Sequence, residues 1–161
     1  MTINAQGKAQ NVKASLEHYI HEKLVVTEGL VVDFQGKPFE SADQQEWVQE
    51  RIMGFPNHDY HRQTTSALEG QTTTVLLNFN IFVNKESPTN RRTNRSYEIR
   101  DIVADYFKIG TEIDLYDASN SDWTTSLQKM FVFDVATDAP ISDETFEQYS
   151  YAVEILWLEQ F

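Results

Sequence analysis

The chain has no cysteine among its 161 residues. Disulfides, thiolate nucleophiles and cysteine-based metal sites are therefore excluded. No apolar run approaches the roughly 20 residues that a membrane-spanning helix needs. The six glycines are scattered, and none stands in a GxGxxG or GxxxxGKS/T setting that would form a phosphate-binding loop. Residues 1–15 are too polar for a secretory signal peptide. We expect a protein made in the cytoplasm, with no cofactor and no membrane partner.

Hydrophobic residues make up 40% of the chain, which is enough for a substantial core. A domain of this length buries roughly 70% of the surface that its unfolded chain exposes, so it needs no covalent or metal staple. We expect a single domain over residues 1–161, with a long loop at about 54–72 and an arginine-rich loop at about 86–95. A connection as long as the first loop is unusual in a compact domain and is often functional.

The charge of the chain is unevenly distributed. The formal net charge is -12, yet residues 85–100 hold five basic and two acidic residues, whereas residues 101–161 hold two basic and thirteen acidic residues. Such a chain can present a positive patch to a negative patch on another copy or on a partner. An ordinary solvated loop is the alternative interpretation of residues 85–100. The overall acidity argues against tight wrapping of nucleic acid.

Two helices are predicted from apolar residues at helical spacing. The first covers about residues 11–24 and is ended by Gly29, and the second covers about residues 96–108, beginning at Ser96 and followed by Gly110. Six strands are predicted from alternation and from turn residues between them, at about residues 30–34, 47–53, 73–85, 113–116, 127–136 and 146–158. This order indicates an α+β fold, a mainly antiparallel sheet with both helices packed on one face.

Two pairs of histidines are candidates for chemistry. His18 and His21 stand three residues apart on the first helix, but nothing in the sequence supplies further metal ligands, and a solvated or buried pair is the alternative. His58 and His61 flank Asp59 in the long loop, which suggests a general base, but no activated nucleophile accompanies them. We therefore predict no catalytic residue and no metal site, and we expect that the protein is not an enzyme.

The last predicted strand carries Tyr149, Tyr151 and Trp157 on one face. These aromatic residues either face the core or belong to a contact between subunits, where Tyr and Trp are enriched. The second faces of strands 73–85 and 146–158 are mixed, since each carries both polar and apolar side chains. A partly apolar and partly polar sheet face is typical of a subunit contact.

The order of elements and several local strings resemble a known family. An amphipathic helix (VKASLEHYIHEKL) precedes VVDFQGKPF and EWVQERI, and the long strand VLLNFNIFV, an arginine-containing turn, the helix YEIRDIVADYF and the closing strand YAVEILWLE follow. In this pattern the chain resembles the tail terminator, or tail completion, proteins of bacteriophages with long non-contractile tails. The resemblance spans nearly the whole chain, and it lies in pattern and order because no single string is diagnostic. The connection at 54–72 is longer than such proteins typically have.

The resemblance implies a structural virion protein that forms a ring, usually a hexamer, on the head-proximal end of the tail tube. Such a ring ends tube polymerisation and offers a surface to the head completion or connector protein, while genomic DNA passes through the lumen without sequence readout. A closed ring needs unlike patches that meet between copies. We predict that the interface includes the following basic and aromatic residues: Arg91, Arg92, Arg95, Arg100, Tyr149, Tyr151 and Trp157.

Two other functions remain open from the sequence. The first is a small acidic, non-enzymatic binding or adaptor module that docks its arginine-rich loop on an acidic partner; it would be a monomer or a dimer. The second is a hydrolase or nucleotide-modifying enzyme that uses His58, Asp59 and His61, although no second carboxylate stands near them in the sequence.

Overall fold

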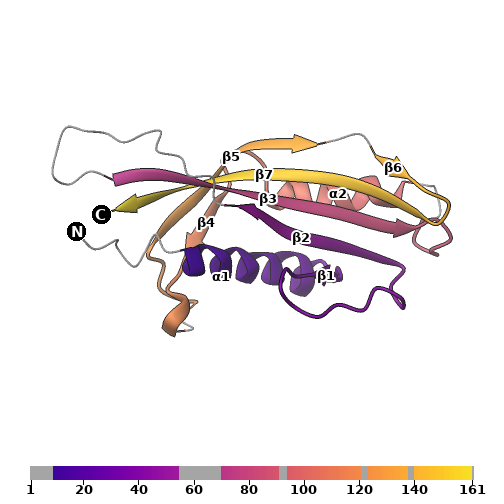
Figure 1. Cartoon of the computed structure of the whole chain (residues 1–161), viewed down its shortest axis with the longest axis horizontal. Helices are drawn as coiled ribbons and strands as arrows, with labels where there is room; N and C mark the ends of the chain where they lie inside the picture. The colour runs from indigo at the N-terminus through magenta and orange to yellow at the C-terminus, as the bar shows by residue number, and fades with distance from the viewer. Residues whose placement is uncertain (1–8, 55–69, 91–93, 121–122, 138–139, 161) are drawn as a thin grey trace.

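A computed structural model describes residues 9–54, 70–90, 94–120, 123–137 and 140–160 of the chain. Over these ranges the chain forms helices packed on a seven-stranded sheet (Figure 1). In chain order the elements are α1 (Ala9–Ile20), the π-helix η2 (His21–Thr27), β1 (Val32–Asp33), β2 (Glu46–Gly54), β3 (Gly70–Asn84), α2 (Arg95–Tyr106), β4 (Glu112–Leu115), the 3-10 helix η4 (Ala118–Asn120), β5 (Gln128–Thr137), β6 (Ile141–Ser142) and β7 (Phe146–Gln160).

The strands follow the order β1-β2-β3-β7-β5-β4, and β6 also pairs with β7. The pair β1–β2 is parallel, whereas the remaining pairs are antiparallel. β3 and β7 form the centre and pair along their whole length, from Gly70 opposite Gln160 to Asn84 opposite Phe146. The predicted α+β fold with a mainly antiparallel sheet is therefore confirmed.

Both helices pack on the same face of the sheet, where the core lies. The ring of Tyr19 on α1 meets the ring of Phe107, directly after α2, edge to face at 5.3 Å between centroids. The ring of Phe107 in turn lies 4.9 Å from that of Phe79 on β3. The alternate side chains of β3 on this face are fully buried: Val75, Leu77, Phe79, Ile81 and Val83. The prediction that the two helices share one face is thus confirmed.

The first helix forms where its apolar spacing predicts it. Val12, Leu16, Ile20 and Leu24 are all 0% exposed, so the whole stripe faces the sheet. The helix continues as the π-turn η2, and Gly29 follows with a φ of +70°. Glycine adopts this left-handed conformation without the steric strain that a Cβ would cause, which explains the stop.

β5 departs from the predicted alternation. The pairing with β7 shifts register between Val132 and Asp134, so Phe133 is an extra residue in the ladder. Such a bulge turns the following side chains to the other face of the sheet. Phe131 and Phe133 are 40% and 41% exposed, while Val135 packs against the core. The prediction that these two phenylalanines share one face with Val135 is therefore wrong.

Smaller differences concern short elements. The strand predicted at 30–34 contains only Val32–Asp33, and the two-residue strand β6 has no counterpart in the prediction. Of the predicted loop at 54–72, residues 70–72 belong to β3, and residues 55–69 lie outside the described ranges. None of the helices in the described part of the chain is long and apolar enough to cross a membrane.

Candidate subunit interface

The described residues cover the sheet face turned away from the helices only in part. Along β3, the residues between the core positions (Leu76, Asn78, Asn80 and Phe82) are half-buried, and so are their neighbours on β7. Apolar and polar side chains share this surface, which we call the open sheet face. Interfaces between protein subunits have a similarly mixed polarity, with apolar side chains among polar ones. The open sheet face is therefore the candidate subunit interface.

Amide and hydroxyl groups form a row across the middle of the open sheet face. The Asn80 side chain donates to Gln49 Oε1 at 3.2 Å, and its Oδ1 accepts from Asn78 at 3.3 Å and from the Ser150 hydroxyl at 2.7 Å. These residues stand on β2, β3 and β7, so the row ties three strands together. Because the groups already have partners within the row, covering them with another surface costs less than burying unpaired groups.

Aromatic rings gather where the open sheet face meets the start of β7. The ring of Trp47 stacks on that of Phe82 at 4.9 Å and meets that of Phe146 edge to face at 5.3 Å. Phe39, from the loop before β2, lies 6.0 Å from the same indole. Trp47 is only 9% exposed, so this cluster anchors the loop before β2 to the sheet.

Two carboxylates stand side by side farther along the same face. Asp134 on β5 lies directly opposite Glu154 on β7, and Glu154 lies opposite Leu76 on β3. The neighbouring pair along the strands is Phe131 with Leu156. We call Asp134 and Glu154 the acidic pair. Like charges placed directly opposite each other on a sheet are destabilising, so the acidic pair does not itself stabilise the pairing of β5 with β7.

The structure places Arg95 differently from the sequence prediction. Its Nε and Nη2 donate to the two carboxylate oxygens of Glu46, each at 2.9 Å, and its Nη1 donates to Glu98 at 3.1 Å. This fork-shaped pair keeps the pKa of Glu46 below its usual value, because the hydrogen bonds from Arg95 and Thr89 outweigh the opposing effect of partial burial. Arg95 is thus engaged within its own chain, and Arg91 and Arg92 lie outside the described ranges.

Arg100 is held against the second helix and the sheet. Its Nη1 donates to the adjacent Asp101 at 3.0 Å, and its guanidinium lies over the ring of Tyr151, 5.4 Å from the centroid. Its side chain is 29% exposed. A guanidinium over an aromatic ring is attracted by the negative face of the ring, so Arg100 supports the packing of α2 in addition to any role at the surface.

Two of the three aromatic residues predicted for an interface belong to the core instead. Tyr151 and Trp157 are each 2% exposed and face the helices, and the Tyr151 hydroxyl donates to the carbonyl oxygen of Phe107 at 3.1 Å. The interface prediction is therefore wrong for these two. Tyr149 is half-buried, and its ring meets that of Tyr97 edge to face at 5.2 Å. Tyr97 is 48% exposed, so this last pair does reach the surface.

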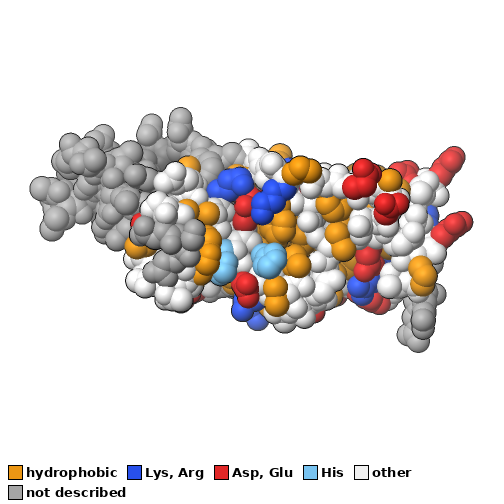
Figure 2. Space-filling view, turned by 90° about the horizontal axis from the view of Figure 1, so that it is seen from below, with side chains coloured by type: hydrophobic (Ala, Val, Ile, Leu, Met, Phe, Trp, Pro, Cys, Tyr) orange, Lys and Arg blue, Asp and Glu red, His pale blue; other side chains and the backbone are white. Residues whose placement is uncertain are grey.

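The positive and acidic segments are interleaved in the fold. Lys85 donates through Nζ to the carbonyl oxygen of Asp143, and its backbone N–H donates to the carbonyl oxygen of Thr145 at 2.9 Å. The start of the basic segment thus lies against a turn of the acidic segment. On the side of the molecule that carries α1, acidic side chains gather at the right-hand end of the view, away from the larger group of grey atoms (Figure 2). The two segments therefore do not form separate patches at this end.

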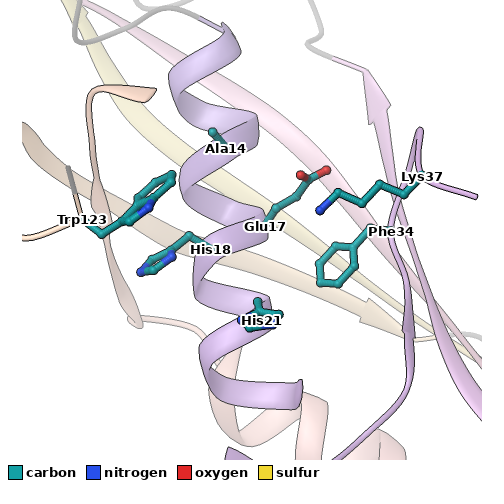
Figure 3. A pocket seen from close by; sticks show the side chains of 7 residues that line it. All are labelled: Ala14, Glu17, His18, His21, Phe34, Lys37 and Trp123. Atoms are coloured by element: carbon teal, nitrogen blue, oxygen red, sulfur yellow. The ribbon is translucent and has the colours of Figure 1, made fainter. Parts of the chain in front are cut away.

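The described histidines border an open hollow of about 260 Å³ on the outer side of α1. The imidazole of His18 stacks on the indole of Trp123 at 4.3 Å, while the side chains of Glu17 and Lys37 extend toward each other across the hollow (Figure 3). Within the described ranges, no three His, Asp or Glu side chains lie where they could share a metal ion. His58 and His61 lie outside those ranges. The lining residues are Ala14, Glu17, His18, His21, Phe34, Lys37 and Trp123.

One buried carboxyl lies between α1 and the sheet. Glu50 on β2 is 0% exposed; its Oε2 accepts from the backbone N–H of Gln35 at 3.0 Å, while its Oε1 has no hydrogen-bond partner among the described residues. Burial raises the pKa of Glu50, and the nearby Glu17 carboxylate raises it further, against the opposing effects of the Gln35 hydrogen bond, Lys13 and Arg51. This carboxyl is therefore harder to ionise inside the fold than in the unfolded chain.

Sequence reasoning missed both the acidic pair and Glu50. The pair depends on which residue of β5 faces which residue of β7, and the bulge at Phe133 sets that register. Glu50 stands between Trp47 and Ile52 in a strand whose alternation is weak, so no pattern marked it as buried. The only feature of the sequence that could have predicted a buried Glu50 is its place at a position of the strand that faces the core.

Comparison with known proteins shows the fold and nothing more. No protein-family model and no curated protein matches the sequence. A solved structure superposes with a TM-score of 0.61 at 10% sequence identity, over 96% of this chain and 97% of that one. The name of that protein describes no function. The agreement over nearly the full length of both chains shows that this arrangement of helices and strands occurs in another protein.

Proposed function

We propose that this chain is a structural virion protein that forms a ring on the head-proximal end of a phage tail tube. The ring ends tube polymerisation and provides the surface for joining the head. Its partners are further copies of itself, in a hexamer, together with the tail tube protein and the head completion protein. Genomic DNA passes through the lumen without sequence readout. The protein acts by assembly in the virion and is no enzyme.

The open sheet face is the observation that carries this proposal. It offers apolar side chains such as Leu76 and Phe82 beside a polar row whose members are already paired. A protein that assembles into a ring needs surfaces that keep the single subunit soluble before assembly and that a neighbouring copy can cover afterwards. A mixed face with satisfied polar groups meets both needs, because its exposed groups tolerate water and cost little to bury.

The resemblance in the order of elements supports the same proposal. The strings that carry the resemblance to tail terminator proteins include those that form α1, β3, α2 and β7, in this order along the chain. Arg91 and Arg92 remain the proposed contacts to an acidic surface. Arg95 is withdrawn from that role, because it is held by Glu46.

A growth assay with tail tube protein tests the proposal. Tube protein of the same phage is allowed to polymerise with increasing amounts of this chain, and tube lengths are measured by negative-stain microscopy. The proposal predicts that tubes become shorter and uniform once the chain is in excess over tube ends. Tubes that grow at the same rate and length with or without the chain would contradict it and would favour the adaptor module.

A further inference from the structure

Two reciprocal hydrogen bonds hold the turn after β1 to β2. The backbone N–H of Gln35 donates to Glu50 Oε2 at 3.0 Å, and Gln35 Oε1 accepts from the backbone N–H of Ile52 at 2.8 Å. The ladder between β1 and β2 covers only Val32–Asp33, so these two bonds continue the attachment beyond it. We call them the Gln35 clip.

The Gln35 clip depends on a carboxyl that is shielded from water. Glu50 is 0% exposed, and its Oε1 has no hydrogen-bond partner among the described residues. Its other oxygen accepts one bond, from the uncharged N–H of Gln35. A carboxylate in this place would lose its hydration and gain only that bond in return, which is costly. Burial therefore opposes the ionisation of Glu50 as long as the clip is closed.

The charged groups that act on Glu50 belong to α1 and β2. On α1, Lys13 forms an ion pair with Glu17, and on β2, Arg51 donates to Asp33 Oδ2 at 2.8 Å. The Glu17 carboxylate disfavours a charge on Glu50, while the two cations favour it. Burial is the largest effect, ahead of the opposing hydrogen bond from the clip, and the net result is a raised pKa for Glu50.

The other elements next to Glu50 are β3 and the turn after β1. Phe79, which is uncharged and fully buried, stands opposite Glu50 on β3. In the turn, the ammonium of Lys37 lies over the ring of Phe34, 5.1 Å from its centroid, and the Lys37 side chain extends across the hollow toward Glu17 (Figure 3). Lys37 is thus directed to the hollow.

The turn that the Gln35 clip holds forms one wall of the hollow beside α1 (Figure 3). Phe34 and Lys37 line this hollow, and the N–H of Lys37 donates to the carbonyl oxygen of Phe34 at 3.2 Å, which closes the turn. Gly36 lies inside the turn with a φ of +82°, a conformation that favours glycine. Because the turn is closed on itself, we expect its residues to move together when the clip opens.

We propose that Glu50 is a pH-sensitive switch that fixes this wall of the hollow. While the carboxyl keeps its proton, it stays buried and the Gln35 clip is closed. When the carboxyl loses its proton, the charge draws water to it, the clip opens and the turn at residues 34–37 leaves β2. The switch lies within the single subunit, so it does not depend on the proposed ring.

The direction of the switch follows from the two pKa values of Glu50. In the open state the carboxyl is hydrated, and its pKa is that of an ordinary glutamate, about 4.3. Because the pKa of Glu50 is raised in the closed state, the closed state is favoured below the ordinary value. As pH rises from the ordinary to the raised value, the ratio of closed to open molecules falls about tenfold per pH unit, and above the raised value it stays constant.

Hydrogen exchange measured by NMR tests the switch in the whole chain. The amides of Gln35 and Ile52 both belong to the clip, and their protection factors are compared over a series of pH values. A protection factor already accounts for the faster intrinsic exchange at high pH. We expect both protection factors to fall about tenfold per pH unit between the two pKa values of Glu50. The amide of Phe79, on the central strand β3, should exchange far more slowly throughout.

Glu50→Gln is the matched variant, because it keeps the size of the side chain and an oxygen for the N–H of Gln35 but cannot ionise. Its protection factors at the clip should not depend on pH. Glu17→Gln should shift the fall in protection to lower pH, since it removes a repulsive charge and frees Lys13 from its ion pair. The exposed Glu22→Gln should behave as wild type. Circular dichroism checks that every variant is folded.

Three results would overturn the inference. The first is protection at the clip that does not change with pH in wild type, and the second is an equal pH dependence in Glu50→Gln, because another group would then be responsible. The third is exchange of the clip amides at the rate of Phe79 and with the same dependence on urea, because the clip would then open only when the whole chain unfolds.

A measurement on the wild-type chain keeps the test valid if Glu50→Gln does not fold. The NMR shift of the Glu50 carboxyl carbon is followed over the same pH series. A shift that titrates above the ordinary pKa, together with the loss of protection at Gln35, supports the switch. A shift that titrates at the ordinary pKa, or apart from the loss of protection, would overturn it.

Discussion

The hydroxyl of Ser15 on α1 accepts a hydrogen bond from the backbone N–H of Tyr116, at 2.8 Å. One helical turn earlier, Asn11 Oδ1 accepts from the N–H of Ala118 at 3.0 Å. Residues four apart on a helix lie on one face, and N–H groups two apart in an extended chain point the same way. The helix thus holds the chain that leaves β4 and covers this edge of the sheet, which is otherwise open to pairing with another chain.

Ser15→Ala should lower the free energy of unfolding by about 1–2 kcal/mol, because the N–H of Tyr116 loses this acceptor and Ser15 is too buried, at 1% exposed, for water to replace it. Urea denaturation followed by circular dichroism measures the change. Ser119→Ala, at an exposed position, serves as the control and should stay within about 0.5 kcal/mol of wild type. Equal losses in the two variants would contradict the role of Ser15.

Glu50→Gln should change how stability depends on pH. Because the pKa of Glu50 is raised in the fold, its carboxyl contributes stability that is fully present below the unfolded pKa, about 4.3. That contribution is lost as pH rises through the folded value. Compared with wild type, Glu50→Gln should therefore gain relative stability as the pH rises from the unfolded pKa of this carboxyl through its higher folded pKa. Urea midpoints at several pH values measure this.

The exposed Glu22→Gln is the control for Glu50 and should leave the slope of stability against pH unchanged. If Glu50→Gln follows the wild-type slope throughout, the carboxyl ionises as easily in the fold as in the unfolded chain, and our account of its burial fails.

Arg95→Ala should lower the free energy of unfolding by about 1 kcal/mol at neutral pH, since a fork-shaped, partly buried pair with Glu46 is lost. The pKa of Glu46 is lowered in the fold, so the difference between wild type and variant should shrink as pH falls toward and below that value. The charge-swapped double variant, Arg95→Glu with Glu46→Arg, should recover part of the lost free energy of unfolding. A larger loss at acidic pH than at neutral pH would contradict the pairing.

Tyr151→Ala and Phe133→Ser should separate folding from assembly. Tyr151 is buried in the core, so its truncation should cost roughly 3–5 kcal/mol of stability, as for other large core residues. Phe133 is 41% exposed, and its replacement should change stability by less than about 1 kcal/mol while weakening attachment to tubes. Thermal unfolding and a tube-binding assay measure the two effects. A folded Tyr151→Ala chain that fails only in assembly would restore the interface role of this tyrosine.

Much of the fold follows from local patterns. The stripe Val12, Leu16, Ile20 and Leu24 predicts α1, because helical spacing leaves one buried face, and all four are fully buried. The alternation along β3 likewise predicts which of its residues form the core. Each of these features depends on neighbours within a few residues, and the sequence displays that spacing directly.

The features that went unpredicted depend on residues far apart in the chain. Tyr151 and Trp157 share a face by alternation, but the pattern does not say whether helices or a neighbouring subunit cover that face. The pair of Arg95 with Glu46 joins residues 49 positions apart. The acidic pair depends on a bulge at Phe133 that no turn residue or proline marks. The uneven charge along the sequence therefore predicts an interface, but it does not tell which residues would form it.

The central claim is a ring at the end of a tail tube, and imaging of tube ends tests it most directly. Purified protein is mixed with isolated tail tubes, its mass is followed by light scattering, and the ends are viewed by negative-stain microscopy. Our account predicts extra ring-shaped density at one end of each tube, the end that joins the head. Tube ends that stay bare while the protein remains a monomer in the presence of tubes would contradict it.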